Sequence, residues 1–190
     1  MARPKQFDED RAVDAAMRAF WSAGYEATST QDLCAATGLG RSSIYNTFSS
    51  KPDLFRRALR RYMDEKNAGL FATVDAAGPV KDRVRALLWN VVEAPEDDPL
   101  GCLVVNSTVE LGPRDAGVAD LLRADLDRRL TALTAMIEAG QRAGEIRTER
   151  PAADLAQFVS ATIGGMRVAA RGGADRATLA GIADVALDCL

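Results

Sequence analysis

Histidine is absent from this chain of 190 residues, and cysteine is scarce. The absence of histidine removes the most common general base and the most common metal ligand, which disfavours many classes of enzyme and most zinc proteins. The three cysteines, Cys34, Cys102 and Cys189, are odd in number and widely spaced, so they predict neither a disulfide framework nor a zinc cluster. We therefore expect no metal ion and no cofactor.

Long apolar runs and aromatic residues are also scarce. No apolar segment approaches the length of a membrane span, and none follows the N-terminus as it would in a signal peptide. Aromatic residues make up only 6% of the chain and alanine is frequent, which favours helices over strands. Hydrophobic residues at 47% and charged residues at 27% are typical of a globular protein. We expect a cytoplasmic, all-α protein without a membrane partner.

Charge is unevenly distributed along the chain, although the net charge is only −3. Residues 1–61 carry 10 Lys and Arg against 7 Asp and Glu, whereas residues 62–190 carry 14 against 20. A basic N-terminal part on an acidic remainder suits a DNA-binding head on a sensor body. Random fluctuation explains this difference in charge equally well.

Three short helices are predicted in the first 48 residues. Apolar residues at helical spacing indicate the first, which Gly24 ends. A capping box, Ser29-x-x-Asp32, opens the second. The turn Thr37-Gly38-Leu39-Gly40 then leads into a third helix over residues 41–48. Two short helices joined by a glycine-containing turn predict a helix-turn-helix.

The third helix has an apolar side and a polar side. Ile44 and Phe48 share one face, whereas Ser42 and Asn46 point nearly opposite and Tyr45 flanks them. Short polar side chains on an exposed face can approach the base edges of DNA. Each of these positions is equally well explained as an ordinary solvated one.

Three stretches, residues 28–33, 36–39 and 43–51, resemble the signature of the TetR/AcrR family of transcriptional repressors. The segment from Gly38 to Lys51 follows the family pattern G-[VL]-x-x-x-x-[LI]-Y-x-x-F-x-x-K, which is much more specific than a helix-turn-helix alone. The resemblance covers roughly residues 8–60. Gly40 departs from it, because the family commonly has a serine or another capping residue there, which puts the N-cap of the third helix in doubt.

The resemblance implies a DNA-binding domain over residues 1–50 and a ligand-binding and dimerisation domain over residues 51–190. It implies that Lys51 and Tyr45 contact phosphates, and that Arg41 is a candidate for reading a base edge. A set of four arginines, at positions 56, 57, 60 and 61, is expected to form a solvated basic face that adds long-range attraction. The DNA-binding residues that we expect are Thr30, Gln31, Arg41, Ser42, Ser43, Tyr45, Asn46, Thr47 and Lys51.

Helical patterns continue through the second half and bring the predicted count to about nine. A capping box over residues 50–53 opens a long helix that reaches about Ala77. An acidic loop is expected over residues 94–99. The later helices are predicted over residues 79–93, 100–111 and 116–143, from Pro151, and after Gly172-Gly173.

Two features of this half predict partners. The last two helices, about residues 151–190, are rich in Ala and Gly, which let helix axes approach closely, so we expect a homodimer through this pair. Packing within one chain is the alternative. Large or polar residues on otherwise apolar faces are candidates for an inducer pocket, although each alone is better explained as a core or surface residue. These candidates are Tyr62, Trp89, Cys102, Asn106, Glu110 and Phe158.

The sequence therefore predicts a DNA-binding transcriptional regulator, a repressor that a small, largely apolar inducer releases from a pseudo-palindromic double-stranded operator. An all-helical enzyme and a structural scaffold are alternatives, but the chain has no paired-carboxylate motif, phosphate loop or metal spacing.

A second hypothesis concerns Cys102. Residues 101–106 resemble a block in the branch that includes the N-ethylmaleimide reductase repressor, where the matching cysteine reacts with electrophiles. If Asp98 caps the following helix and Pro99 is its first residue, Cys102 lies in the first turn, where the helix dipole favours a thiolate. Asp97 and Asp98 oppose this effect. The alternative is a small buried hydrophobe, which we favour.

Overall fold

The computed structural model describes residues 9–94 and 101–190, and within these ranges it contains nine α-helices and no strand. The predicted all-α fold is confirmed. Asp8 and most of the expected acidic loop lie outside the described residues. The helices are α1 (Glu9–Ala23), α2 (Thr30–Thr37), α3 (Arg41–Phe48), α4 (Lys51–Val74), α5 (Val80–Val92), α6 (Leu103–Glu110), α7 (Ala116–Arg142), α8 (Ala152–Arg171) and α9 (Arg176–Asp188).

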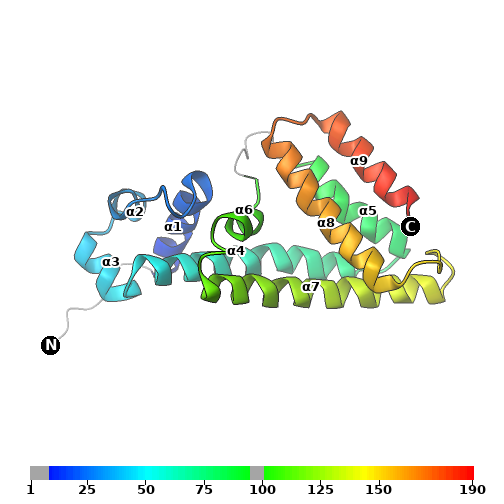
Figure 1. Cartoon of the computed structure of the whole chain (residues 1–190), viewed down its shortest axis with the longest axis horizontal. Coiled ribbons are helices and arrows are strands. Elements are labelled where there is room, and N and C mark those ends of the chain that lie inside the picture. The colour runs from blue at the N-terminus through cyan, green and yellow to red at the C-terminus, as the bar shows by residue number, and fades with distance from the viewer. Residues whose placement is uncertain (1–8, 95–100) are drawn as a thin grey trace.

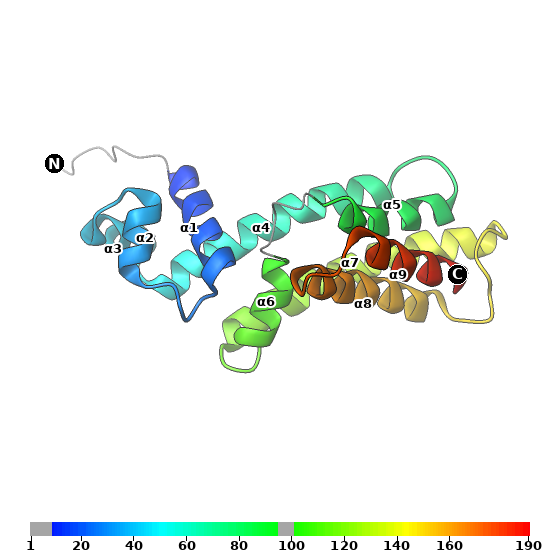
Figure 2. The same cartoon turned by 90° about the horizontal axis from the view of Figure 1, so that it is seen from above.

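The molecule is elongated, with a small group of helices at one end and a larger bundle at the other. Helices α1 to α3 form the first group, which we call the head, and α4 runs from it along the length of the molecule beside α7 (Figure 1). Helices α5, α8 and α9 pack at the far end, and α6 lies between the two groups (Figure 2). We call α4 to α9 the body.

The core of the head does not end at residue 50. Phe20, Leu33 and Phe48 are buried together with the first half of α4, and the ring of Phe20 lies 5.0 Å from that of Phe55 in an edge-to-face arrangement. The same cluster continues into α6 and α7 through Leu103 and its neighbours. Because the first half of α4 shares this core with α1 to α3, the head is packed onto the helix that runs into the body.

The body has its own core, built by α5, α7, α8 and α9 around Leu88, Ile137 and Val159. At Gly140 the helix α7 approaches the start of α5 closely, since a Cβ atom there would lie 2.9 Å from Cβ of Val80. No helix in the described ranges is long and apolar enough to cross a membrane.

Side-chain caps form at four of the helix starts in the described residues, those of α2, α4, α7 and α9. Both hydrogen bonds of the Ser29–Asp32 capping box are present at the start of α2: each side chain accepts from the backbone N–H of the other residue. At the start of α4, Ser50 Oγ accepts from the backbone N–H of Asp53 at 3.2 Å, but the Asp53 carboxylate accepts from the Ser50 hydroxyl rather than from its backbone. Gly40 is the N-cap of α3 and supplies no side-chain bond, as its lack of a side chain requires. The capping rules therefore hold where a polar side chain is present.

The predicted start of α6 is wrong. The helix begins at Leu103 and not at residue 100, because Gly101 has a left-handed φ of 70° and Cys102 is extended with φ −122°. Cys102 is therefore the N-cap and does not lie in the first helical turn. Asp97, Asp98 and Pro99, on which that prediction depended, lie outside the described residues.

Candidate functional site

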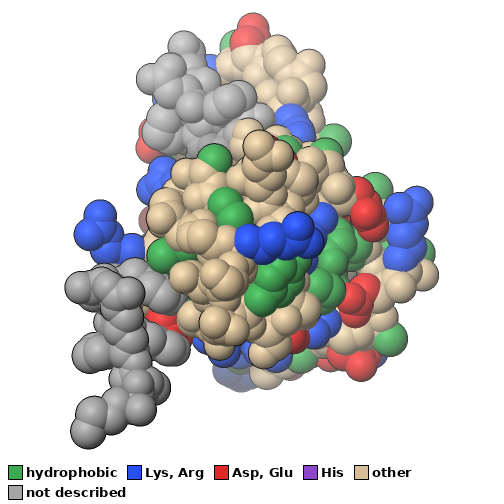
Figure 3. All heavy atoms as spheres, turned by 90° about the vertical axis from the view of Figure 1, so that its left-hand side faces the viewer, with side chains coloured by type: hydrophobic (Ala, Val, Ile, Leu, Met, Phe, Trp, Pro, Cys, Tyr) green, Lys and Arg blue, Asp and Glu red, His purple; other side chains and the backbone are tan. Residues whose placement is uncertain are grey.

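The end of the head presents the turn between α2 and α3 and the polar side of α3. Gly38 ends α2 with a φ of 69°, a left-handed conformation that glycine adopts without strain. Ile44 and Phe48 of α3 are buried, as predicted, whereas Arg41 and Asn46 are exposed. Figure 3 looks onto this end: Lys and Arg side chains cross its middle, and Asp and Glu side chains lie mainly toward its edges.

The structure brings Thr30, Arg41 and Tyr45 together on this face. The hydroxyl groups of Tyr45 and Thr30 are hydrogen-bonded at 3.1 Å, which joins the start of α2 to α3. This bond, and secondarily the charge of Arg41, lowers the pKa of Tyr45 below its ordinary value. The guanidinium of Arg41 lies 5.7 Å from the centre of the Tyr45 ring. The Tyr45 hydroxyl is thus held in place at the surface of the head.

The other predicted DNA-binding residues lie on the same helices or at the start of α4. Gln31 and Ser42 are exposed, and Ser43 and Thr47 are half-buried beside them in sequence. Lys51, the first residue of α4, places its ammonium 4.3 Å from the centre of the Tyr25 ring. A cation held over an aromatic ring keeps its charge while losing mobility.

The expected basic face of α4 is largely neutralised. Three of its four arginines pair with carboxylates, so this face adds less long-range attraction than the sequence predicts. In the described part of the chain, Arg60 has no ion pair. The ion pairs are Arg56–Asp53 at 2.6 Å, Arg57–Glu9 at 3.6 Å and Arg61–Asp14 at 3.2 Å.

Three cavities surround α6 in the body. The central cavity, of about 500 Å³, lies among α4, α5, α7 and α8. The α7 cavity, of about 360 Å³, lies among α6, α7 and α8, and the junction cavity, of about 510 Å³, lies among the end of α1, α6 and α8. Cys102 and Arg167 border all three. A small molecule in any of them would contact the short helix between head and body.

Four of the six predicted pocket residues border these cavities. Tyr62 borders the central cavity, whereas Asn106 and Glu110 border the junction cavity, and Cys102 lies between them. The other two lie elsewhere. Trp89 packs against the body core with the guanidinium of Arg85 5.2 Å from its ring centre. Phe158 is 39% exposed on α8 and does not border these three cavities.

Glu110 ties α6 to the head. Its carboxylate accepts hydrogen bonds from the backbone N–H groups of Tyr25 at 3.0 Å and Glu26 at 2.8 Å, in the segment between α1 and α2. Gly24 makes this approach possible, because it has a φ of 87° and a Cβ atom there would lie 3.2 Å from the Glu110 carboxylate. The head is therefore held by the same helix that borders the cavities.

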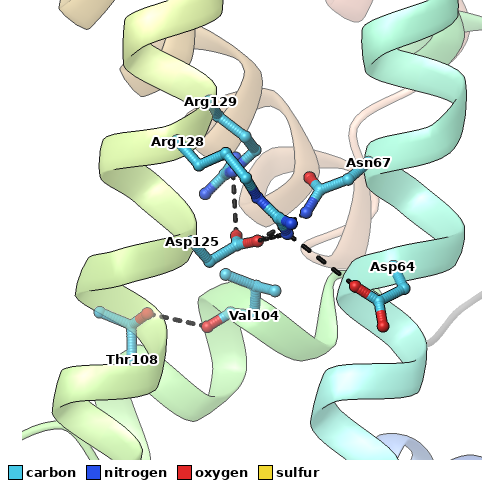
Figure 4. A network of polar contacts seen from close by, with 7 residues as sticks. All are labelled: Asp64, Asn67, Val104, Thr108, Asp125, Arg128 and Arg129. Carbon is cyan, nitrogen blue, oxygen red and sulfur yellow. Dashed lines mark hydrogen bonds and ion pairs between the residues drawn. The ribbon is translucent and has the colours of Figure 1, made fainter.

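Asp125 is the centre of a buried polar network that joins α4 to α7 (Figure 4). It accepts hydrogen bonds from Asn67 Nδ2 at 2.6 Å and from Arg129 Nε at 3.0 Å, and Arg128 completes the network at 3.4 Å. Asn67, Asp125 and Arg129 also border the central cavity. The charge of this buried carboxylate is therefore compensated. The network was not predicted from the sequence, because Asn67 on α4 and Asp125 on α7 are 58 positions apart.

Comparison with known proteins gives matches over both parts of the chain. The family described as "Bacterial regulatory proteins, tetR family" matches residues 12–58, and the family described as "Tetracyclin repressor-like, C-terminal domain" matches residues 80–184. The chain is 35% identical over 189 residues to the HTH-type transcriptional repressor ComR of Escherichia coli (strain K12), covering 97% of this chain and 90% of ComR. It is 28% identical over 155 residues to the repressor DhaR of Mycobacterium sp. (strain GP1), covering 79% and 75% of the two chains.

A solved structure shows the same arrangement of helices. A cysteine-substituted variant of the TetR family regulator CifR, complexed with 26-bp double-strand operator DNA, has a TM-score of 0.87 and 29% sequence identity. The alignment covers 98% of both chains. The similarity therefore extends over the head, α4 and the body together.

Proposed function

Because the chain belongs to the TetR family of bacterial regulatory proteins, we propose that it is a repressor that a small molecule releases from a pseudo-palindromic operator. It is a DNA-binding regulator and not an enzyme. One observation carries the release mechanism: α6 borders all three cavities and, through Glu110, holds the head. A protein that acts on operator DNA works in the cytoplasm of a bacterium.

The exposed side of α3 is the surface that we propose for operator binding. Arg41, Ser42 and Asn46 carry the donors and acceptors that read base edges, and Gln31 of α2 lies exposed nearby in sequence. Thr30, Tyr45 and Lys51 are placed for phosphates, with Ser43 and Thr47 as further hydroxyl donors. The similarity to CifR, which was solved on operator DNA, supports this assignment.

The proposed dimer interface is the outer face of α8 and α9. Large apolar side chains are exposed there, and the space around Gly165 and Gly181 is open, so a second helix pair could approach closely. Two copies of the pair would form a four-helix bundle with two-fold symmetry. The exposed apolar side chains are Phe158, Val168, Ile182 and Val185, of which Val185 is 65% exposed.

Release requires that the inducer bind one arrangement of the body better than another. A molecule that enters a cavity beside α6 can shift that helix and pull on the segment between α1 and α2 through Glu110. Helix α4, which borders the central cavity, connects that cavity to α3. Together these two links would change the spacing of the two heads of a dimer, and hence their fit to two half-sites.

The experiment that tests this proposal begins with selection of the operator from random duplex DNA. A small-molecule collection is then screened by thermal shift, and each ligand is tested in a band-shift assay with the selected operator. We expect at least one ligand that stabilises the protein to lower its operator affinity. Failure to select any preferred DNA, or ligands that all leave operator affinity unchanged, would contradict the proposal.

The variant Glu110→Ala tests the link from α6 to the head. It removes two charge-assisted hydrogen bonds, so the factor by which the inducer lowers operator affinity should fall about fivefold or more. Ligand affinity and operator affinity without ligand should change less. Glu138→Ala, at an exposed position of α7, is the matched control and should behave as the wild type does. If Glu110→Ala responds fully to inducer, the link through α6 is not the route.

Release of the operator through reaction of Cys102 with an electrophile is the second candidate mechanism, because Cys102 borders all three cavities. On this hypothesis, treatment with N-ethylmaleimide abolishes operator binding in the wild type, whereas Cys102→Ser keeps operator binding under the same treatment. Band shifts before and after treatment measure both. If the two proteins respond alike, Cys102 is a packing residue and the inducer binds reversibly.

A further inference from the structure

The central cavity contains a polar group that the protein itself leaves without a partner. Tyr62 is only 1% exposed and borders this cavity, yet its hydroxyl makes no hydrogen bond of ordinary geometry among the described residues, although the Cys102 thiol and the Leu103 backbone lie near it. A buried hydroxyl without a partner costs free energy, so its retention in a cavity wall points to a ligand that supplies the bond. Burial first, and then the neighbouring Cys102 thiol, raise the pKa of Tyr62. The phenol therefore stays protonated and can donate.

Arg167 provides an uncompensated positive charge at the same place. It is half-buried on α8, borders the cavity, and has no ion pair or hydrogen bond within the described ranges. Arg167 and Tyr62 border the same cavity, and the charge of Arg167 acts to lower the pKa of the Tyr62 phenol. A half-buried guanidinium with free donors is a ready partner for an acceptor that enters the cavity.

Apart from Lys66, the other charged groups that border the central cavity are paired with groups of opposite charge. Glu65 pairs with Arg61 at 3.2 Å, and Glu93 pairs with Arg176 at 3.9 Å. Arg129 is bound to Asp125, as Figure 4 shows. These pairs leave little net charge to oppose an anion.

Lys66 is the remaining cation on the wall of the cavity. Its ammonium lies 5.5 Å from the centre of the Tyr62 ring and 5.7 Å from that of Trp21, so it adds positive potential on the α4 side. A cationic ligand would therefore meet both Arg167 and Lys66. The electrostatics favour an anion.

The remaining wall of the central cavity is apolar. Leu70, Leu87 and Ile163 border it from three different helices, α4, α5 and α8. An apolar chain or ring would be removed from water there, whereas a strongly polar molecule would lose hydration without replacement contacts. The site thus combines one positive end with an apolar body.

We propose that the inducer is a small monocarboxylate with an apolar chain or ring, bound in the central cavity with its carboxylate on Arg167 and the Tyr62 hydroxyl. This rests on the proposed function, since it names the class of molecule that would release the DNA. The carboxylate accepts from the guanidinium and from the phenol, and the apolar part packs among Leu70, Leu87 and Ile163.

Titration calorimetry of the full-length protein with matched probes tests the ligand class. The probes are octanoate, octanol and octylamine, which share one apolar chain and differ in the head group, with cinnamate and cinnamyl alcohol as an aromatic pair. We expect at least one of the carboxylates to bind about tenfold or more tightly than its alcohol, since a charge-assisted hydrogen bond to arginine is lost with the alcohol. Octylamine should bind more weakly than octanoate.

Two variants locate the carboxylate. Arg167→Gln should remove the preference for the carboxylate and leave the affinity for the alcohol within about twofold. Tyr62→Phe keeps the ring and should weaken binding of the carboxylate by about threefold to tenfold. Arg142→Gln, a substitution on α7 outside the three cavities, is the matched control and should behave as the wild type does. Thermal unfolding of each variant shows that it is folded.

The outcomes separate this inference from the proposed function. Equal or tighter binding of the alcohol or amine, no binding of either carboxylate, or an unchanged preference in Arg167→Gln would overturn the ligand class. Band-shift assays of operator binding in the presence of the same probes measure release of the DNA separately. A carboxylate that binds through Arg167 but leaves operator affinity unchanged supports the site and contradicts release from it.

Discussion

Tyr45→Ala should weaken operator binding by about thirtyfold or more. The substitution removes a hydroxyl that Thr30 holds at the surface of α3, and it removes the ring on which Arg41 rests. A lost contact of this kind costs about 1–3 kcal/mol, and a dimer loses it twice. Fluorescence anisotropy with the selected operator measures the change.

Two comparisons make this result specific. Tyr45→Phe keeps the ring but loses the hydrogen bond at 3.1 Å to Thr30, so it should fall between the wild type and Tyr45→Ala. The thermal midpoint should change little in both variants, because Tyr45 is only half-buried. Wild-type operator affinity in folded Tyr45→Ala would mean that α3 is not the DNA-binding helix.

Val185→Asp should turn the dimer into a monomer at micromolar concentration. The Val185 side chain lies on the outer face of α9 and is 65% exposed in the single chain, so the monomer should tolerate the substitution. In a two-fold interface each copy would place one unpaired carboxylate in an apolar contact. A cost of about 2 kcal/mol or more per copy weakens association about a thousandfold. Light scattering coupled to size-exclusion chromatography measures the mass.

Val109→Asp is the matched control for the dimer. Val109 is the most exposed of the large apolar side chains in the described chain, at 77%, but it lies on α6 and not on the outer face of α8 and α9. It should leave the mass unchanged. Operator affinity should fall in Val185→Asp, because two half-sites are then bound independently. A Val185→Asp protein that remains a dimer would place the interface elsewhere.

Local patterns in the sequence predicted the fold class and the head. The turn glycine Gly38, the capping box of Ser29 and Asp32, and the buried pair Ile44 and Phe48 all act within one or two helical turns. Such features depend on neighbouring residues, so they can be recognised before any packing is known. The same local logic failed at α6, where no described polar side chain caps the helix and Gly101 delays its start.

The long-range contacts within the chain were decided only by the tertiary structure. Glu110 is hydrogen-bonded to Tyr25, which lies 85 residues away in the sequence, and Asp125 is hydrogen-bonded to Asn67, which lies 58 residues away. Nothing in the local pattern marks either pair. The arginines of α4 show the same point, since a run of positive charge in the sequence becomes a set of ion pairs once α1 lies beside it.

The chain by itself thus determined which segments are helical, and it predicted which short helix would face DNA, because backbone propensity, capping and periodicity are properties of adjacent residues. Tertiary packing decided which side chains have partners. The buried hydroxyl of Tyr62 and the uncompensated charge of Arg167 exist only because α4 and α8 meet at one cavity. Burial and pairing depend on distances between helices, and a linear pattern does not contain those distances.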